Sequence, residues 1–333
     1  MLVNIIVSRN RISGEVRTGI RLRLENSPPG VNYRVIEDPV GLSPTHNDFY
    51  ITSDTTFKWF LKTIVEPIYS LKLRKLTHAF FLNLYIPHSP WVQEIDQPIF
   101  NLFEKYLNKP RNGAFYRLAV GTFKRLFNRD NVIMITWTRW SKEGLEEEGF
   151  RDVRVVPPPM RTSFRKIDNE VTVGFIGVEY HRKGGDIAED VMAKLPRWVR
   201  KVYVGKSPRR VDGITYYNPM RRDDLLKLMA EFDVLLFPTR GEAYGFTVLE
   251  AMSMGIPVVA SNVDSMPEVV SDGGIICDVD DIRCFLDSVK ELVNSPEYAM
   301  ELGARAKAIV TQRHSPSIVG KELLAIYREL SDE

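Results

Sequence analysis

Residues 234–261 read VLLFPTRGEAYGFTVLEAMSMGIPVVAS, and this stretch decides the fold class. It begins with an apolar run that predicts a buried strand, followed by a turn that contains Gly241 and Gly245. Residues 247–254 have the composition of a helix, and residues 257–261 predict a second buried strand. A strand, a helix and a strand in this order indicate a βαβ unit, whose strands run parallel in one sheet.

The same alternation continues on both sides of this stretch, which predicts an α/β domain with a parallel sheet and helices on both faces. In such a sheet, ligands bind beyond the carboxyl ends of the strands. The other elements expected here are strands at 171–176 and 201–204 and helices at 186–194, 223–231 and 282–294.

The chain has 333 residues, which is enough for two domains of roughly 150 residues each. Three consecutive prolines at 157–159 can continue neither a helix nor a central strand, so they indicate a domain linker. We therefore expect an N-terminal domain of residues 1–156 and a C-terminal domain of residues 157–315. The elements expected in the first domain are strands at 2–7, 33–37, 77–86 and 132–136 and helices at 56–75, 97–107, 116–127 and 141–148.

Composition excludes several classes of protein. The chain is 44% hydrophobic and 26% charged, as in ordinary globular proteins, and its net charge of +2 argues against a dedicated nucleic-acid binder. Cys277 and Cys284 are the only cysteines, too few for a disulfide framework, which favours a reducing cytoplasm. No stretch reaches the roughly 18 apolar residues of a transmembrane helix. We expect a cytoplasmic protein, with the inner membrane surface as the alternative location.

The turn before the helix at 247–254 is suited to binding an anion. The first N–H groups of a helix have no partner within the helix, and the helix dipole adds positive charge there. Phe246 and Thr247 open this helix, and Gly245 allows a diphosphate oxygen to approach the backbone. Glu242 precedes the site and Glu250 lies one turn into the helix, so both carboxylates can accept hydrogen bonds from the hydroxyls of one ligand.

The spacing of these residues resembles the signature of glycosyltransferase family 4. That family has two glutamates separated by seven residues, as Glu242 and Glu250 are here. A Gly-x-Pro-Val-Val-Ala segment follows, which Gly255 and Pro257 match, and then Pro-Glu-Val, which includes Glu268. The resemblance is specific over residues 170–290 and faint before residue 130.

The resemblance implies a GT-B fold, in which two Rossmann-like domains with parallel sheets face each other across a cleft. The C-terminal domain would bind the nucleotide sugar, residues 1–156 would form the acceptor side, and a last helix at about 316–333 would pack back onto them. Glu250 would bind the ribose hydroxyls. Glu242, with the backbone at Gly245, Phe246 and Thr247, would face the transferred sugar and the phosphates, and the anomeric configuration would be retained.

A second glycine-containing loop follows the strand at 171–176. The family often has an arginine directly after the first glycine, here Gly177, and a lysine five residues later, both binding the diphosphate. Lys183 matches the lysine, but Val178 stands at the arginine position. Arg182 is a neighbouring basic residue that would replace the missing charge. A solvated basic turn is the alternative interpretation of this loop.

Aromatic residues near the ends of two strands are candidates for the base-binding site. Tyr217 is the principal one, with Gly205, Tyr216 and Asn218 beside it, because an aromatic face can stack on a base. Ordinary strand tyrosines are the alternative. The sequence does not distinguish a uridine donor from a guanosine donor.

In the N-terminal half, the resemblance points to His88 and Gly14. His88 follows the apolar run at 77–86 and lies between prolines. Members of the family usually have a histidine at this place that faces the cleft. His78 is the rival histidine, and a structural role is the alternative for either. Gly14 would approach the phosphates or the acceptor without a side chain in the way.

Basic and aromatic residues also alternate within 58–75 and 117–127. One interpretation is a peripheral membrane contact that serves a lipid-linked acceptor. Two ordinary helices with solvated lysines are the interpretation that we favour.

We therefore predict a retaining glycosyltransferase that transfers a hexose from a nucleoside diphosphate sugar to a sugar, lipid-linked or protein-linked acceptor. Glu242, Lys183 and His88 are the predicted catalytic residues. No Asp-x-Asp pair borders the phosphate site, so we expect neither a metal nor another cofactor. The alternative is a GT-B protein with reduced catalysis that acts as a nucleotide- or sugar-binding regulatory module. A Rossmann dehydrogenase is rejected because residues 8–19 contain no Gly-x-Gly-x-x-Gly.

Overall fold

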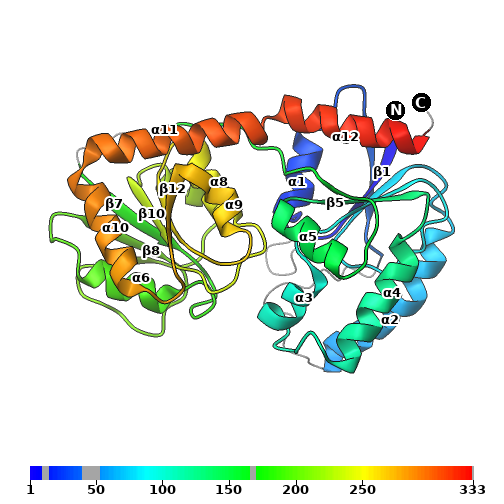
Figure 1. Cartoon of the computed structure of the whole chain (residues 1–333), viewed down its shortest axis with the longest axis horizontal. Coiled ribbons are helices and arrows are strands. Elements are labelled where there is room, and N and C mark those ends of the chain that lie inside the picture. Colours follow the sequence, from blue (N-terminus) through cyan, green and yellow to red (C-terminus); the bar gives the residue numbers. More distant parts are fainter. Residues whose placement is uncertain (10–14, 40–52, 166–169, 332–333) are drawn as a thin grey trace. The chain divides into compact units, whose positions relative to one another are not determined.

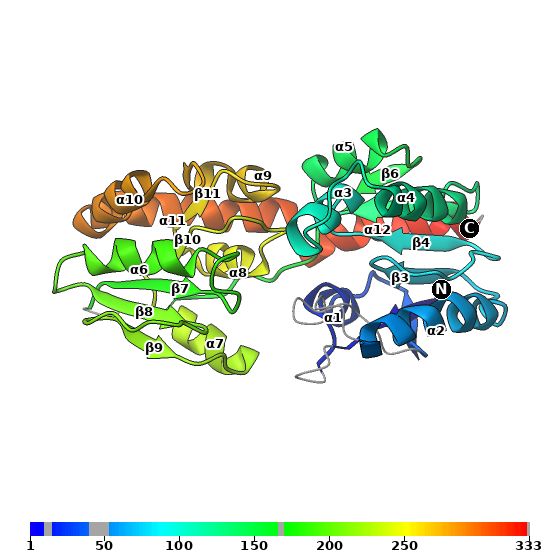
Figure 2. The ribbon, with the colours of Figure 1, turned by 90° about the horizontal axis from the view of Figure 1, so that it is seen from below.

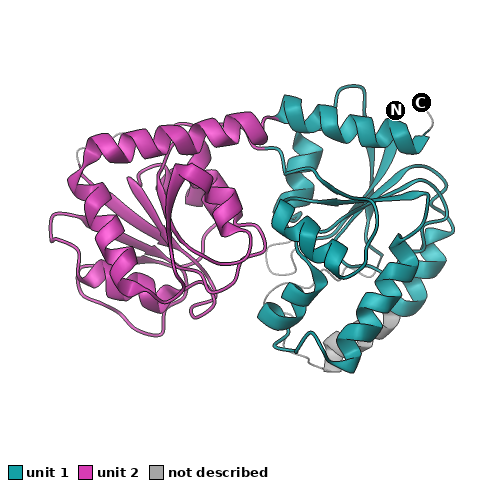
Figure 3. Cartoon of the chain, viewed as in Figure 1, with its two compact units in different colours: residues 1–159, 316–333 teal, residues 160–315 magenta. Residues whose placement is uncertain are grey.

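The computed structural model describes residues 1–9, 15–39, 53–165 and 170–331. It divides into two compact units, one of residues 1–159 with 316–333 and one of residues 160–315 (Figure 3). Each unit contains one parallel sheet, six-stranded in the described residues. The predicted domain boundary, after residue 156, lies three residues before the observed boundary, after Pro159.

In unit 1 the strand order is β2-β1-β3-β4-β5-β6, and every neighbouring pair is parallel. The strands β3, β4 and β5 are buried throughout, because both faces of the sheet are covered by helices. The strands are β1 (Leu2–Val7), β2 (Asn32–Glu37), β3 (Thr77–Phe80), β4 (Trp91–Glu94), β5 (Val132–Thr136) and β6 (Val153–Val155).

The helices of unit 1 cover both faces of its sheet (Figure 1). The C-terminal helix α12 (Pro316–Ser331) buries Val319, Leu323 and Tyr327 against β1, β4 and β5 on one face. The other face is covered by a separate apolar cluster that includes Phe123 and Phe127. The remaining helices are α1 (Thr18–Glu25), α2 (Ser53–Ser70), α3 (Ile99–Asn101) with a π-helical turn (Leu102–Tyr106), α4 (Ala114–Phe127) and α5 (Arg139–Glu147).

In unit 2 the strand order is β12-β11-β10-β7-β8-β9, again with parallel pairing throughout. Helices α6 and α7 lie on opposite sides of strands β7 to β9 (Figure 2). The strands are β7 (Thr172–Ile176), β8 (Arg200–Val204), β9 (Thr215–Tyr217), β10 (Val234–Phe237), β11 (Val258–Ser261) and β12 (Gly274–Cys277). The helices are α6 (Gly185–Ala193), α7 (Arg222–Met229), α8 (Phe246–Met254), α9 (Met266–Val270) with a 3₁₀ turn (Ser271–Gly273), α10 (Ile282–Asn294) and α11 (Pro296–Arg313).

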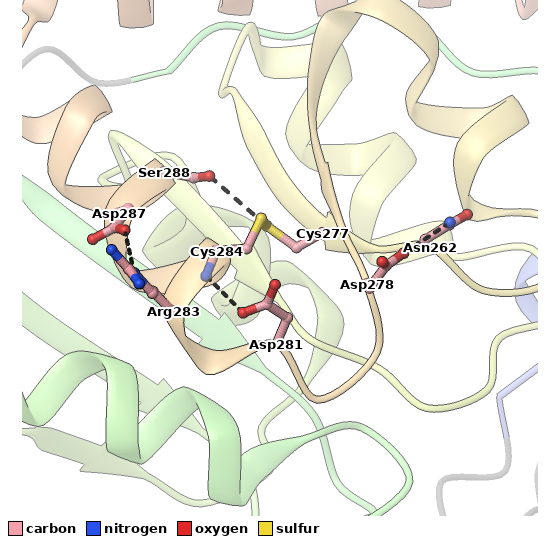
Figure 4. The surroundings of a disulfide bond; sticks show 8 residues. All are labelled: Asn262, Cys277, Asp278, Asp281, Arg283, Cys284, Asp287 and Ser288. Carbon is pink, nitrogen blue, oxygen red and sulfur yellow. Dashed lines mark hydrogen bonds and ion pairs between the residues drawn. A yellow bond between two sulfur atoms is a disulfide. The ribbon is translucent and has the colours of Figure 1, made fainter.

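Cys277 and Cys284 form a disulfide with a Cα–Cα distance of 5.7 Å (Figure 4). The cysteine count favoured a reducing cytoplasm, where disulfides are rare, and this bond removes that argument. Cys277 ends β12 and Cys284 lies in the first turn of α10, so the intervening turn brings the two side chains together. Asp281 caps α10 by accepting a hydrogen bond from the Cys284 N–H at 3.0 Å, which fixes this turn.

None of the helices in the described ranges is long and apolar enough to cross a membrane.

Candidate functional site

The carboxyl edge of the unit 2 sheet brings three loops together, those after β7, β8 and β10. Gly184 caps α6 with φ of 72°, and a Cβ there would lie 1.9 Å from the carbonyl oxygen of Pro238. Gly245 caps α8 with φ of 84°, and a Cβ there would lie 2.7 Å from Met266. Both positions favour glycine because the backbone is left-handed, and at Gly184 the backbone of Pro238 is also too close for a side chain.

Lys183 and Glu242 form an ion pair at this edge, one from the loop after β7 and one from the loop after β10. Both side chains are largely buried. Burial lowers the pKa of the Lys183 ammonium, and the neighbouring Glu242 only partly offsets this. Burial alone would raise the pKa of Glu242, but the charges of Lys183 and Arg182 lower it overall. The lowered pKa of Glu242 favours its carboxylate form, which the neighbouring Lys183 and Arg182 stabilise.

The Glu242 carboxylate also accepts a hydrogen bond from the N–H of Gly245, the residue that caps α8. Its own N–H donates to the Asp264 carboxylate at 2.9 Å. An anionic group thus already lies between a lysine and a helix N-terminus, where the helix dipole favours negative charge. Phe246 and Thr247 form the first turn of this helix and are partly exposed. The arrangement suits a bound phosphate that takes the place of the carboxylate.

Arg182 joins the loop after β7 to the loop after β10. Its Nη1 donates to the carbonyl oxygen of Gly241 at 2.6 Å, and its Nε donates to Glu179 at 2.5 Å. The N–H of Arg240 donates back to the Arg182 carbonyl at 2.8 Å. Val178 is 44% exposed and adds no charge. Arg182 therefore fixes the two loops against each other and contributes positive charge beside Lys183 and Glu242. A Cβ at Gly177 would lie 2.7 Å from the Lys183 side chain, so this glycine leaves room for the lysine.

Glu250 is buried on α8 and forms an ion pair with Arg222, the first residue of α7. Sequence reasoning missed Arg222, which lies just before the helix predicted at 223–231. The two residues are 28 positions apart, and no local pattern links an arginine at one helix start to a glutamate on the next helix.

A second missed residue is Glu189, a fully buried carboxylate on α6. It accepts hydrogen bonds from Tyr180 at 2.8 Å, Ser207 at 2.6 Å and Tyr216 at 3.0 Å, and it pairs with Arg209 at 2.5 Å. These contacts hold the loop after β8 against α6. The hydroxyl of Tyr216, a base-binding candidate, is therefore engaged in a structural contact.

Tyr217, the principal base-binding candidate, ends β9 at the carboxyl edge. Its carbonyl oxygen accepts from the Gly205 N–H at 2.9 Å. Its hydroxyl lies beside Arg200, the first residue of β8, and it adds to the effect of Glu231 in raising the pKa of that guanidinium. The backbone of Tyr217 is at the predicted edge, whereas its hydroxyl points back toward the amino end of the sheet.

The expectation that His88 directly follows a strand at 77–86 was wrong. The predicted strand at 77–86 ends at Phe80, where Phe81 adopts φ of 59° and turns the chain. Pro90 accepts from the N–H of Thr77, the first residue of β3, and β4 begins at Trp91. His88 therefore lies near the amino end of the unit 1 sheet, away from the carboxyl ends where ligands bind in such sheets.

His78 has a structural environment. It is fully buried on β3, with Nε2 at 2.8 Å from Glu94 and Nδ1 at 2.6 Å from the hydroxyl of Tyr327 on α12. Glu94 also pairs with the fully buried Arg23, whose Nη2 donates to the carbonyl oxygen of Val156 at 2.7 Å. This network ties α1, β3, β4 and α12 together within unit 1. Gly14 lies outside the described residues.

Comparisons with known proteins agree with the geometry of unit 2. Residues 170–295 match the family model described as glycosyl transferases group 1. An N-acetyl-alpha-D-glucosaminyl L-malate synthase of Bacillus anthracis is 30% identical over 116 residues, which cover 34% of this chain and 30% of that protein. A D-inositol 3-phosphate glycosyltransferase of Mycolicibacterium smegmatis is 28% identical over 205 residues, covering 54% of this chain and 46% of that protein. The chain thus spans less than half the length of these two curated relatives.

Solved structures share the fold along the whole chain. Sucrose-phosphate synthase from Thermosynechococcus elongatus has a TM-score of 0.74 at 14% identity, with 100% of this chain and 99% of that chain covered. The Anabaena protein HepE, solved with UDP and glucose, has a TM-score of 0.71 at 15% identity, with 100% of both chains covered. These findings confirm the resemblance to GT-B glycosyltransferases and the predicted fold class of two α/β domains with parallel sheets.

Proposed function

We propose that this protein is a glycosyltransferase that takes a sugar from a nucleoside diphosphate sugar bound at the carboxyl edge of the unit 2 sheet. The observation that carries the proposal is the largely buried Lys183–Glu242 pair at the N-terminus of α8. A lysine, a helix N-terminus and two loops that glycine allows to approach each other closely form a site suited to a diphosphate. Glu250, one turn further along α8, would accept hydrogen bonds from the ribose hydroxyls.

The donor diphosphate would displace the Glu242 carboxylate from Lys183 and from the Gly245 N–H. Lys183 and the first amides of α8 would then stabilise the charge that develops on the leaving diphosphate. The released Glu242 carboxylate would turn toward the hydroxyls of the transferred sugar. This exchange keeps the buried lysine paired with an anion in both states, which avoids leaving an unpaired charge in the site.

We further propose transfer of a hexose with retention of its anomeric configuration and without a metal ion. The basis is the family resemblance for retention, and the positive charge of Lys183, Arg182 and the α8 N-terminus for the metal-free site. HepE has been solved with UDP-glucose, so UDP and UDP-glucose are the first probes to use.

An anionic membrane surface is the proposed environment of the acceptor. Residues 105–129 carry seven basic and no acidic residues, and Phe115 and Leu118 of α4 are each 66% exposed. Exposed apolar side chains among basic ones are typical of helices that bind the interface of an anionic bilayer. Lys62, which the sequence placed in a second basic segment, is instead buried and pairs with Glu66 at 3.0 Å, so α4 is the principal candidate.

The decisive experiment combines binding with turnover. UDP and GDP are titrated in a thermal-shift assay, where a ligand at about 100 times its Kd stabilises the fold by about 2.7 kcal/mol. Hydrolysis of UDP-glucose and GDP-mannose is then followed without an acceptor. Binding together with hydrolysis supports the enzyme, binding without any turnover supports the regulatory module, and absence of binding refutes the donor site.

A further inference from the structure

Arg222 is the residue of unit 2 that joins the helix after β9 to the proposed ribose carboxylate. It is the first residue of α7, and its guanidinium pairs with Glu250 on α8. The sheet order places β7 and β8 between β9 and β10, so this contact spans two strands at the carboxyl edge. Arg222 thereby connects the region of the base-binding candidates to the region of the ribose.

The burial of the pair explains why the contact matters. The Glu250 side chain is 6% exposed and that of Arg222 is 21% exposed. A carboxylate this buried needs a hydrogen-bonded cation, and removing one partner leaves the other charge uncompensated. Arg222 is the more exposed member, so its guanidinium holds Glu250 from the solvent side of the pair.

A guanidinium can serve both neighbours at once. It carries five N–H donors in one plane, so one edge can hold the carboxylate while another donates to a ligand hydroxyl. A lysine at this position would supply the charge without the planar arrangement. The guanidinium also restricts the rotamers of Glu250, so the carboxylate oxygens keep one orientation before the ligand arrives.

We propose that Arg222 is a positioning residue that orients Glu250 for the vicinal hydroxyls of the donor ribose, and that it thereby sets the preference for ribonucleotide over deoxyribonucleotide donors. This inference rests on the proposed function, because Glu250 must bind the ribose. Arg222 should therefore affect the preference for a ribose over a deoxyribose. It should not affect the affinity for the diphosphate in general.

The test measures Kd for UDP and for 2′,3′-dideoxy-UDP, and for the corresponding guanosine pair, by isothermal titration calorimetry. The wild type should prefer the ribonucleotide at least about tenfold, as expected for loss of charge-assisted hydrogen bonds. Arg222→Ala should weaken binding of the ribonucleotide about tenfold and reduce that preference to below about threefold. Arg222→Lys keeps the positive charge, so it should retain more of the preference for the ribonucleotide than Arg222→Ala does. A merely structural role of Arg222 does not predict this difference.

Arg221→Ala is the matched control. Arg221 is the exposed neighbour that caps α7, so its loss removes the same charge without removing the contact to Glu250. It should keep the wild-type preference. Arg222→Gln, which keeps much of the side chain and loses the charge, replaces Arg222→Ala if the alanine variant does not fold, and it should show the same loss.

The outcomes separate this inference from the proposal on which it rests. If the wild type binds neither nucleotide, or Glu250→Gln keeps the full preference for the ribonucleotide, the donor-site assignment fails and this inference falls with it. If Glu250→Gln loses the preference while Arg222→Ala and Arg222→Gln retain it, the donor site stands and Arg222 is not a positioning residue.

Discussion

Reducing the Cys277–Cys284 disulfide should destabilise unit 2 by a predictable amount. The two cysteines are seven positions apart, so the bond closes a loop of about eight residues. The chain-entropy relation gives about 2.5 kcal/mol of stabilisation for a loop of about eight residues at 25 °C. For a unit of this size, each kcal/mol corresponds to about 2–4 °C in melting temperature, so reduction should lower the Tm of the unit by about 5–10 °C.

The assay is differential scanning calorimetry of the wild type with and without a phosphine reductant, with free thiols counted in each sample. Cys284→Ala is the control, because Cys284 is partly exposed on α10 and its truncation leaves the buried Cys277 in place. The variant should melt at the lower temperature, and the reductant should not shift it. A wild type in which both thiols are freed without a change in melting temperature would refute the reasoning.

Reduction of the disulfide should have only a small effect on nucleotide binding at the donor site. The loop that the disulfide closes carries Asp280, which pairs with Arg240 in the loop after β10 at 2.8 Å. Arg240 is also held by Asp186 at 2.8 Å. Well below the melting temperature, reduction should therefore change the Kd for UDP less than about threefold, since the contact of Arg240 with Asp186 does not depend on the disulfide.

Four further predictions concern the site, unit 1 and the membrane. Lys183→Ala should lower transfer more than about tenfold with an unchanged circular dichroism spectrum, and wild-type activity should survive excess EDTA; loss in EDTA with recovery in Mg²⁺ would contradict the metal-free site. Glu250→Ala should weaken UDP binding by about 1.5–3 kcal/mol, whereas Glu242→Gln should mainly slow transfer; equal effects on binding would remove the distinction. Burial raises the pKa of Glu94, but Arg23 and His78 lower it overall to about 2. The carboxylate therefore adds about 3 kcal/mol to the free energy of unfolding above pH 4.5, and this contribution should be lost as the pH falls from 4.5 toward 2. Acid denaturation of Glu94→Gln should show a shallower pH dependence in that window. Phe115→Ala with Leu118→Ala should reduce sedimentation with phosphatidylglycerol vesicles and leave UDP binding unchanged, and equal sedimentation of variant and wild type would exclude α4 as the contact.

The sequence by itself determined the features of this protein that depend on a few neighbouring residues. The apolar runs at 171–176, 201–204 and 234–237 predicted buried strands, because a run of that length flanked by turns has few other stable conformations. Gly245 and the residues after it predicted a turn followed by a helix N-terminus suited to an anion, because the conformational freedom of glycine and the direction of the first N–H groups of a helix are local properties.

Only the tertiary structure decided which distant residues meet. Arg222 reaches Glu250, and Tyr216 and Arg209 reach Glu189, because the carboxyl ends of parallel strands lie at one edge of the sheet. The same packing assigned His78 to a buried network with Tyr327. His88 lies at the other edge because the chain turns at Phe81 and returns before β4. Such contacts follow from strand order and the path of the chain in space, and the spacing of residues along the sequence does not encode them.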